Sequence, residues 1–322
     1  MPTDFAQTLN RFGKERKPFF FVINFEQTEF LAQSLETLSS DILYAFEDKS
    51  NAKKPYISPR NPSFDIKKKV DKQRYKEAFE KIIEEIKSGN TYMLNLTFPT
   101  TITLEGTLEE IFYTTQAPFK CCLKNHFVCF SPERFIRIEE NTISTYPMKG
   151  TIDASMDNAQ EVILQDEKEM AEHVMVVDLL RNDLSMVATH VCVEKFRYID
   201  TLKAGEKTLL QVSSKITGKL DTSWHERIGD IVTTLLPAGS ISGTPKRSSV
   251  DIIKTVEGYD RGYFTGVFGI FDGRTLDSAV MIRYIEKTSD GYVFKSGGGI
   301  TLLSDEQKEY DELCSKVYLP VH

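Results

Sequence analysis

The sequence predicts an α+β fold built mainly from antiparallel sheets. Short runs rich in β-branched and aromatic residues outnumber the helical patterns along the chain. These runs do not alternate regularly with helices, as the strands of a doubly wound parallel sheet would. With 322 residues, of which 40% are apolar and 27% are charged, the chain has the composition of an ordinary globular protein and enough length to bury a large core.

The N-terminal part of the chain contains a predicted strand, a connector, a helix and a second strand. Residues 18–25 form an aromatic and β-branched run that indicates a buried strand. Residues 49–63 are polar and carry prolines, so we expect a connector there. Between residues 75 and 86 the apolar side chains recur at helical spacing, and Gly89 stands where a C-terminal cap belongs. Residues 91–98 alternate as a strand does.

The remainder of the chain mixes strands with helices. The helical pattern of residues 165–183 predicts one long helix. A second helix is expected to begin at Thr244 and Pro245, an N-cap followed by a proline in the first turn, and to end near Gly258. A last helix is expected after a capping box of Ser304 and Gln307. The predicted strands are residues 127–130, 135–138, 266–271, 278–285 and a strand ending at 296–299.

Composition excludes several classes of function. The net charge of −7, without a basic stripe, argues against nucleic acid as a partner. No apolar run approaches the 18 or more residues that span a bilayer, and the N-terminus does not resemble a signal peptide, so we expect a cytoplasmic protein without a membrane partner. The five cysteines show no Cys-x-x-Cys spacing, which favours reduced thiols over a zinc site.

Residues 146–151, YPMKGT, place a lysine in an unusual setting. Lys149 stands between a proline and a glycine, with threonines and serines around it. A lysine amine normally keeps its proton up to a pKa of about 10.4, so a nucleophilic role requires desolvation or nearby positive charge. The alternative interpretation, a solvated loop lysine, stays open on these residues alone.

Two predicted helices carry carboxylates at helical spacing. Glu169 and Glu172 lie three residues apart, and Glu309, Glu312 and Lys316 share one face of the last helix. Each face is either solvated or functional. Glutamates from two separate helices are suitable ligands for Mg²⁺, which prefers oxygen atoms. The last helix also follows the Gly297, Gly298 and Gly299 triplet, and a loop without side chains lets a ligand approach the backbone closely.

Two further features are suited to anions. Residues 237–246, PAGSISGTPK, form a glycine- and serine-rich turn that leads into a helix, although the glycine spacing is not that of a Walker loop. Arg283 lies inside a predicted strand, where burying its charge is costly without a partner. That partner is either a structural carboxylate or the carboxylate of a ligand.

Six ordered motifs give the chain a resemblance to the chorismate-utilising enzymes. They are residues 131–135 (SPERF), 146–151 (YPMKGT), 172–183 (EHVMVVDLLRND), 237–246 (PAGSISGTPK), 261–266 (RGYFTG) and 296–300 (SGGGI). The resemblance covers residues 75–317 and implies a sandwich of two mainly antiparallel sheets with helices on the outer faces. It also implies one chorismate-binding catalytic domain over residues 1–322, in which residues 1–63 are a shortened N-terminal portion.

Within this family the residue at the position of Lys149 separates activities. Anthranilate synthases carry alanine there and aminodeoxychorismate synthases carry lysine, so the resemblance implies the second activity. Lys149 would attack C2 of chorismate, Glu133 would protonate the departing 4-hydroxyl, and ammonia would then add at C4 as the lysine leaves. Glu172, Glu309 and Glu312 would hold Mg²⁺. The substrate would be bound by Thr151, Gln211, Ser240, Arg283, Gly297, Gly298, Gly299 and Lys316.

Some positions depart from the family pattern. Gln211 replaces a common histidine and cannot act as an acid, Phe264 replaces a common tyrosine, and Ser240 replaces the threonine frequent in anthranilate synthases. The N-terminal portion does not match the family's tryptophan-binding motif, so feedback inhibition by tryptophan is not expected. No cysteine lies in a nucleophile elbow, and the resemblance therefore implies a glutamine amidotransferase subunit as the partner that supplies ammonia.

Three alternatives remain. Anthranilate synthase is disfavoured by Lys149 itself. Isochorismate and salicylate synthases use a lysine to activate water at the position of Met93, and methionine cannot act as a general base. A catalytically inert scaffold for a glutaminase is disfavoured because Glu133, Lys149, Glu172 and Glu312 are all present.

Overall fold

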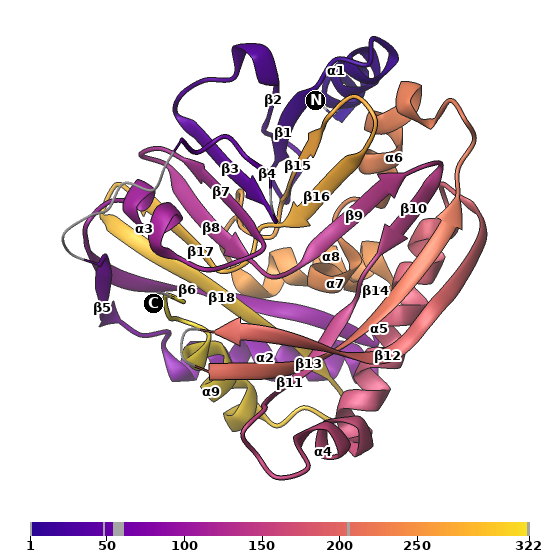
Figure 1. Cartoon of the computed structure of the whole chain (residues 1–322). Coiled ribbons are helices and arrows are strands. Elements are labelled where there is room, and N and C mark those ends of the chain that lie inside the picture. Colours follow the sequence, from indigo (N-terminus) through magenta and orange to yellow (C-terminus); the bar gives the residue numbers. More distant parts are fainter. Residues whose placement is uncertain (1, 48, 54–60, 205–206, 321–322) are drawn as a thin grey trace. The chain divides into compact units, whose positions relative to one another are not determined.

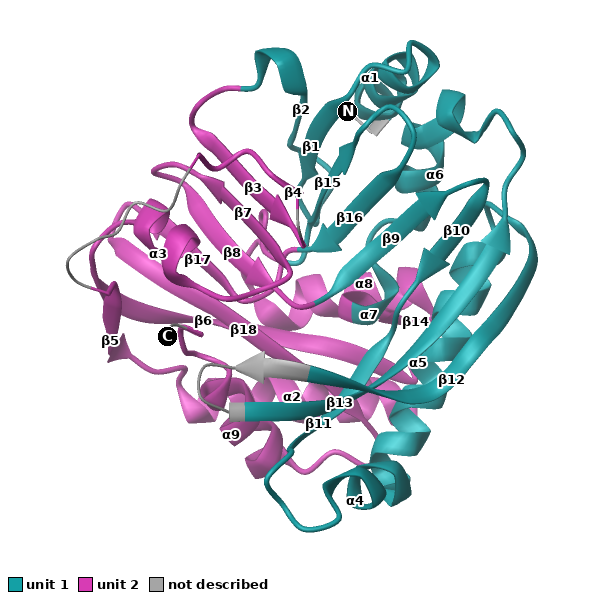
Figure 2. Ribbon diagram, in the orientation of Figure 1, with its two compact units in different colours: residues 1–38, 133–240, 265–280 teal, residues 39–132, 241–264, 281–322 magenta. Residues whose placement is uncertain are grey.

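The computed structural model describes residues 2–47, 49–53, 61–204 and 207–320 (Figure 1). Residues 54–60, the centre of the predicted connector, therefore lie outside the described residues. The chain divides into two compact units, each assembled from three separate segments (Figure 2). Unit 1 comprises residues 1–38, 133–240 and 265–280, and unit 2 comprises residues 39–132, 241–264 and 281–322.

Unit 1 contains a nine-stranded sheet whose strand order is β11-β13-β10-β9-β16-β15-β1-β2, with β12 paired to β13. Its strand pairings among the described residues are antiparallel. Its strands are β1 (Phe19–Ile23), β2 (Phe30–Ser34), β9 (Arg134–Glu139), β10 (Thr142–Thr145), β11 (Met148–Asp153), β12 (Thr189–Ala204), β13 (Lys207–Lys219), β15 (Val267–Phe271) and β16 (Leu276–Val280).

The helices of unit 1 pack their apolar faces on this sheet or on one another. Leu180 and Leu184 of α5 line one small pocket together with Phe135 and Ile136 of β9. Phe5 of α1 is fully buried, with its ring 5.8 Å from that of Phe21 in β1. The helical segments are α1 (Pro2–Lys14), η1 (Leu35–Thr37), α4 (Ala159–Gln165), α5 (Glu167–Ser185), η2 (Trp224–Arg227) and α6 (Ile228–Leu235), and the short α7 (Gly239–Ser242) lies where the chain passes from unit 1 to unit 2.

Unit 2 contains the second nine-stranded sheet, in the order β14-β6-β18-β17-β8-β7-β3-β4, with β5 paired to β6. Its strands are β3 (Ile42–Phe46), β4 (Lys49–Ser50), β5 (Ser63–Lys68), β6 (Met93–Glu105), β7 (Phe119–Leu123), β8 (Phe127–Ser131), β14 (Gly243–Thr244), β17 (Tyr284–Thr288) and β18 (Gly291–Thr301). Its helices are α2 (Lys72–Lys87), α3 (Leu108–Thr114), α8 (Lys246–Glu257) and α9 (Glu306–Ser315). Apolar residues of α2, α8 and α9 form one core cluster with Leu94, Leu96 and Ile300 of the sheet.

The structure confirms the predicted α+β class with two antiparallel sheets and several individual elements. The helix predicted from residues 75–86 is α2, and Gly89 just beyond it has the left-handed φ of +78° that a helix end favours. The helix predicted to end near Gly258 is α8, for which Gly258 is the C-cap. In the described residues, no helix is both long enough and apolar enough to cross a membrane.

The sequence missed one helix, and its predictions for one strand and for two helix caps were wrong. The N-terminal helix α1 was not expected, although Phe5 and Leu9 are buried at helical spacing. The predicted helix of residues 165–183 is confirmed as α5, which begins at Glu167 because the side chain of Asp166 caps it by accepting from the backbone of Glu169. Residues 278–285 form parts of two strands, β16 and β17.

Two predicted helix caps were wrong. Asp305, rather than Ser304, is the N-cap of α9, and its side chain accepts from the backbone of Lys308. Ser304 accepts from the backbone of Thr301 instead. Likewise Thr244 belongs to β14, and Pro245 takes the N-cap position of α8 without a side-chain bond. Several residue types can cap a helix, so the pattern alone locates such an end only to within a residue or two.

Candidate active site

A β-bulge in unit 1 determines where Lys149 points. Along β11, Met148 pairs with Ser213 of β13 and Thr151 pairs with Gln211, so three steps on β11 match two on β13. The extra residue bends the strand locally and redirects its side chains. Gly150, inside the bulge, has a φ of +82°, a conformation that is unfavourable for residues with a side chain. The bulge thus lies at the residue that the sequence singled out.

Lys149 meets a buried carboxylate of α5. Its Nζ lies 2.5 Å from Oε2 of Glu172, whose side chain is only 3% exposed. Lys168, one turn earlier on α5, brings its Nζ to 3.7 Å from Oε1 of the same carboxylate. A buried carboxylate is costly unless positive charge compensates it, and here two lysines do so. Lys149 is therefore not the solvated loop lysine of the alternative interpretation.

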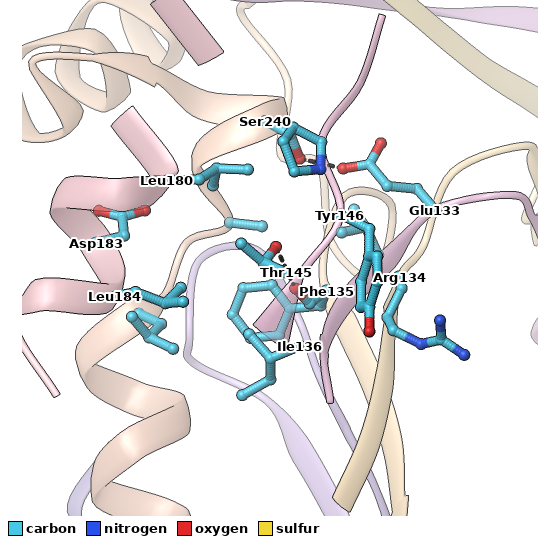
Figure 3. Close-up of a pocket in the computed structure, with 14 residues that line it drawn as sticks. Glu133, Arg134, Phe135, Ile136, Thr145, Tyr146, Leu180, Asp183, Leu184 and Ser240 are labelled. Carbon is cyan, nitrogen blue, oxygen red and sulfur yellow. Dashed lines mark hydrogen bonds between the residues drawn. The ribbon is translucent and has the colours of Figure 1, made fainter. Parts of the chain in front are cut away.

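Glu133 and Ser240 form a second pair in unit 1, at a pocket of about 10 Å³, room for roughly one water molecule (Figure 3). Glu133 lies in the turn before β9, and the Ser240 hydroxyl of α7 donates a hydrogen bond to its Oε1. Burial raises the pKa of the Glu133 carboxyl, and this effect exceeds the lowering that the Ser240 hydrogen bond causes. A carboxyl that keeps its proton to higher pH is suited to act as an acid.

Thr151 and Gln211 lie opposite each other on β11 and β13. The Gln211 Nε2 is 3.5 Å from the Thr151 hydroxyl, at the limit of a hydrogen bond. Two buried oxygens nearby, Oε1 of Gln211 and Oγ of Ser213, have no hydrogen-bond partner among the described residues. Because residues two apart in a strand share a face, Gln211 and Ser213 present polar atoms on the same side of the sheet. Ser213 was not predicted from the sequence.

His173, beside Glu172, was also not predicted. It is fully buried, and its Nε2 lies 2.7 Å from the hydroxyl of Ser214 in β13, which in turn accepts from the backbone of Arg197. Burial lowers the pKa of His173 to about 4, with smaller effects from the charges of Arg197 and Lys149. The imidazole is therefore neutral at neutral pH and joins α5 to the sheet. In the sequence, only its place in the 172–183 motif pointed to it.

In unit 2, the predicted glycines, Lys316 and Arg283 gather at one end of β18. The Lys316 Nζ donates to the backbone oxygen of Gly297 at 2.8 Å and pairs with Glu312 at 2.7 Å. A guanidinium nitrogen of Arg283 lies 3.3 Å from the backbone oxygen of Lys316. A Cβ added at Gly298 would lie 3.6 Å from the Lys316 Nζ and 3.7 Å from Oε2 of Glu309. Because Gly298 has no side chain, it leaves open space beside the Lys316 ammonium and the Glu309 carboxylate.

Gly297 is required by its neighbours in the sheet. It pairs with Thr97 of β6, and a Cβ there would come within 2.5 Å of the Thr97 methyl carbon and 2.6 Å of the Leu96 backbone oxygen. Behind β6, the buried Glu257 accepts from the backbone of Thr97 and forms an ion pair with Arg261 at 2.7 Å. Both partners of this pair are 1% exposed. Strand β18, which carries the glycines, therefore pairs with β6, and the buried pair of Glu257 and Arg261 holds β6 in place.

The predicted magnesium ligands differ in their surroundings. Glu172 has a buried oxygen, Oε1, that accepts no hydrogen bond in the described residues, and Glu309 is 5% exposed. Carboxylate oxygens of this kind fit a hard divalent cation. Glu172 belongs to unit 1, whereas Glu309 and Glu312 belong to unit 2. Within the described ranges, no group of three or more His, Cys, Asp or Glu side chains lies close enough to hold a metal ion, so the Mg²⁺ site stays a prediction.

Comparison with known proteins defines the class of this protein. The family model described as chorismate binding enzyme matches residues 5–321, and the chain belongs to that family. It is 49% identical over 318 residues to an uncharacterized PabA-like protein of Haemophilus influenzae, covering 98% of this chain and 96% of that protein. It is 32% identical to aminodeoxychorismate synthase component 1 of Salmonella typhimurium, covering 77% of this chain but only 57% of that longer protein.

Solved structures support the same fold. A protein described as the 2,3-dihydroxybenzoate-specific isochorismate synthase DhbC of Bacillus anthracis matches with a TM-score of 0.73 and 19% identity, over 98% of this chain and 86% of that one. Anthranilate synthase component I of Streptococcus pneumoniae matches with a TM-score of 0.65 and 24% identity, over 80% of this chain and 59% of that one. At these identities the likeness establishes the fold and leaves the reaction open.

Proposed function

We propose that this protein is an aminodeoxychorismate synthase, which converts chorismate and ammonia to 4-amino-4-deoxychorismate and water. The observation that carries the proposal is the 2.5 Å contact between Lys149 Nζ and the buried Glu172 Oε2. It holds the lysine in a partly desolvated site, 25% exposed, beside a group within proton-transfer distance. The identity with aminodeoxychorismate synthase component 1 supports the same reaction.

The proposed reaction has two displacements. The neutral Lys149 amine forms a bond to C2 of chorismate, the ring double bonds shift, and the C4–oxygen bond breaks. Glu133 gives its proton to the departing oxygen, which leaves as water, and the attacking amine passes a proton to Glu172. Ammonia then forms a bond to C4 and gives a proton to the Glu133 carboxylate, the double bonds shift back, and the bond from C2 to Lys149 breaks as the lysine nitrogen takes its proton back from Glu172. Covalent catalysis thus replaces one difficult displacement by two easier ones.

The remaining predicted residues bind and orient the substrate. Arg283, Lys316 and the glycines of β18 would receive its carboxylates, because guanidinium, ammonium and open backbone form charge-assisted hydrogen bonds with carboxylate. Glu172, Glu309 and Glu312 would hold Mg²⁺, which supplies positive charge for the ring carboxylate.

The competing reactions are less consistent with the site. Met93, at the position where isochorismate synthases would need a lysine, is 4% exposed within β6, and its thioether cannot take a proton from water. Anthranilate formation is disfavoured because Lys149 stands where that activity has alanine. The proposal includes a glutamine amidotransferase subunit as the source of ammonia and a cytoplasmic location.

A product assay tests the reaction. The purified chain, given chorismate, Mg²⁺ and ammonium chloride, is expected to form 4-amino-4-deoxychorismate, detected by liquid chromatography with mass spectrometry. Glutamine in place of ammonium should give no product unless a glutaminase subunit is added. Anthranilate or isochorismate as the main product would overturn the assignment, and unchanged chorismate would favour an inert scaffold.

Intact-mass spectrometry tests the covalent step directly. With chorismate and no ammonia, the protein is expected to gain the mass of chorismate less one water molecule. Lys149→Ala should abolish this adduct. Lys168→Ala is the matched control, because Lys168 approaches the same carboxylate from 3.7 Å but is not the proposed nucleophile, and its adduct should persist. An adduct retained in Lys149→Ala would show that another residue is the nucleophile.

A further inference from the structure

The contact between Ser240 and Glu133 gives the serine a role different from the one that the sequence suggested. Ser240 was expected to receive a substrate carboxylate, yet its hydroxyl donates to Oε1 of Glu133. A serine hydroxyl has a single proton to donate. While the Ser240 hydroxyl donates its hydrogen bond to Glu133, it cannot donate one to an anionic substrate.

We propose that Ser240 is a positioning residue, whose hydroxyl holds the Glu133 carboxyl in one orientation and leaves the acidic proton on the other oxygen, Oε2. The chemistry of a carboxylic acid supports this assignment. Its carbonyl oxygen accepts hydrogen bonds and its hydroxyl oxygen carries the proton, so a donor fixed at Oε1 favours the form protonated at Oε2. The inference rests on the proposed function, in which Glu133 protonates the leaving hydroxyl.

Both partners of this contact are held by rigid parts of unit 1. On the Glu133 side, the backbone of Val280 donates to the Glu133 carbonyl at 3.1 Å, and Arg134 makes two hydrogen bonds, of 2.8 and 3.2 Å, to Asp277. Val280 and Asp277 both belong to β16. The turn that carries Glu133 is thereby fixed to the neighbouring strand.

On the Ser240 side, the preceding Gly239 lets α7 approach α5 closely. A Cβ at Gly239 would lie 2.9 Å from Oδ2 of Asp183 and 3.0 Å from a methyl carbon of Leu180. Neither distance leaves room for a side chain. Two residues that are 107 positions apart in sequence therefore meet because β16 holds one and α5 holds the other (Figure 3).

The charged and titratable groups around Glu133 come from several elements. Arg134 is paired with Asp277 and lies over the Tyr146 ring, and Asp183 of α5 lines the same pocket. The Ser240 hydrogen bond opposes the rise in the Glu133 pKa that burial causes. Removing the hydroxyl while keeping these neighbours should therefore raise the pKa of Glu133 further.

A titration without substrate tests the inference independently of the reaction. Protein with ¹³C-labelled aspartate and glutamate is titrated by NMR, and the Glu133 carboxyl signal is assigned by its absence in Glu133→Gln. Ser240→Ala should move the Glu133 titration to higher pH, and Ser240→Thr, which keeps a hydroxyl, should restore it. If Ser240→Ala fails to fold, a Ser240→Thr titration unlike that of the original protein contradicts the inference by itself.

Ser223→Ala is the matched control, since Ser223 also donates to a carboxylate, that of Asp221, at 2.7 Å. This hydrogen bond is the main cause that lowers the pKa of Asp221. Ser223→Ala should move the Asp221 titration to higher pH and leave the Glu133 titration at the same pH. A Glu133 titration that moves equally in both variants would overturn the inference.

Kinetics separate positioning from substrate binding. Ser240→Ala is expected to lower kcat by about tenfold with KM for chorismate changed less than about twofold, as when an interaction acts only in the transition state. A rise in KM with unchanged kcat would overturn the inference, because it would mean that Ser240 contacts the substrate. Should the product prove to be anthranilate or isochorismate, the proposed function fails, whereas the substrate-free titration still decides whether Ser240 positions Glu133.

Discussion

Each unit carries a lysine–glutamate pair at its predicted site, and the two pairs differ in the carboxylate. Lys149 and Lys316 are both 25% exposed, and they lie 2.5 and 2.7 Å from their glutamates. Glu172 is 3% exposed, however, whereas Glu312 is 51% exposed. Charges interact strongly in a buried site and weakly near solvent. The same two residue types can therefore hold a reacting amine in unit 1 and a binding cation in unit 2.

The neighbours of the two lysines support this division. Lys149 lies in the β11 bulge, which redirects its side chain. Its partner Glu172 is also approached by a second cation, Lys168. Lys316 lies one helical turn from Glu312 and also donates to the Gly297 backbone oxygen, beside Arg283. Under the proposed function, the carboxylate beside the lysine of unit 1 would take up a proton, and the groups beside the lysine of unit 2 would bind an anion.

The largest expected effect comes from replacing each of the two lysines by alanine in a separate variant. Lys149→Ala should lower kcat by about 10³-fold or more, because it removes the nucleophile. Lys316→Ala should raise KM for chorismate by about tenfold with kcat changed less than about threefold, since one charge-assisted hydrogen bond is lost. Steady-state kinetics with ammonium check both, and similar losses of kcat in the two variants would break the comparison.

Removal of the acid in unit 1 should have the next largest effect. Glu133→Gln is expected to lower kcat by about 10²-fold or more, in the range of general acid catalysis. An acid works only while protonated, so the rate of the original protein should fall as pH rises through the raised pKa of Glu133. That decline should disappear in the variant. A variant that keeps the decline would show that another group limits the rate at high pH.

His173 gives unit 1 a specific dependence of stability on pH. Burial lowers its pKa from 6.5 to about 4, so between these values the unfolded chain binds a proton that the folded chain does not. The free energy of unfolding therefore falls as pH decreases from about 6.5 to about 4, by up to about 3 kcal/mol at 1.36 kcal/mol per pKa unit. Urea unfolding across this range should show a smaller decline in His173→Gln, and an identical decline would contradict the prediction.

The smallest expected effects distinguish two adjacent glycines of β18. Gly297→Ala should lower the free energy of unfolding by about 1–3 kcal/mol, because its Cβ would clash with Thr97 and the Leu96 backbone at 2.5 and 2.6 Å.

Gly298→Ala is the partner variant. Its Cβ would make only ordinary contacts at 3.6 and 3.7 Å, so stability should change by less than about 0.5 kcal/mol. KM for chorismate should nevertheless rise by about tenfold, since a methyl group enters the space beside Lys316. Urea unfolding and steady-state kinetics on both variants check the pair. Equal destabilisation by the two substitutions would contradict this reading of β18.

Local patterns were sufficient for elements whose stability is largely local. Helix α2 was expected because apolar side chains recur every turn, helix α8 was expected from a proline in its first turn, and a glycine follows the end of each. The same signal was present for α1, in Phe5 and Leu9, but the polar and charged residues around them obscured it. Helix α5 was also expected from its helical pattern, and it begins directly after its cap Asp166.

Long-range pairing could not be predicted in the same way. Each sheet joins strands from separate segments of the chain, such as β1 with β15 in unit 1 and β6 with β18 in unit 2. Strand patterns indicate which residues are extended, but they do not specify partners, because backbone hydrogen bonds are the same for every sequence. For this reason Ser213 and His173 were not recognised as neighbours of the site.

The sequence by itself determined the residue types of the site and their place in six ordered motifs, from which membership of the chorismate-binding family and the choice of Lys149 followed. It also determined the antiparallel α+β class, because periodicity and composition are local properties. Only the tertiary structure decided that Lys149 meets a buried Glu172 and that Ser240 contacts Glu133. The physical reason is that burial, the bulge in β11 and contacts across many residues arise from packing, which no short stretch of sequence specifies.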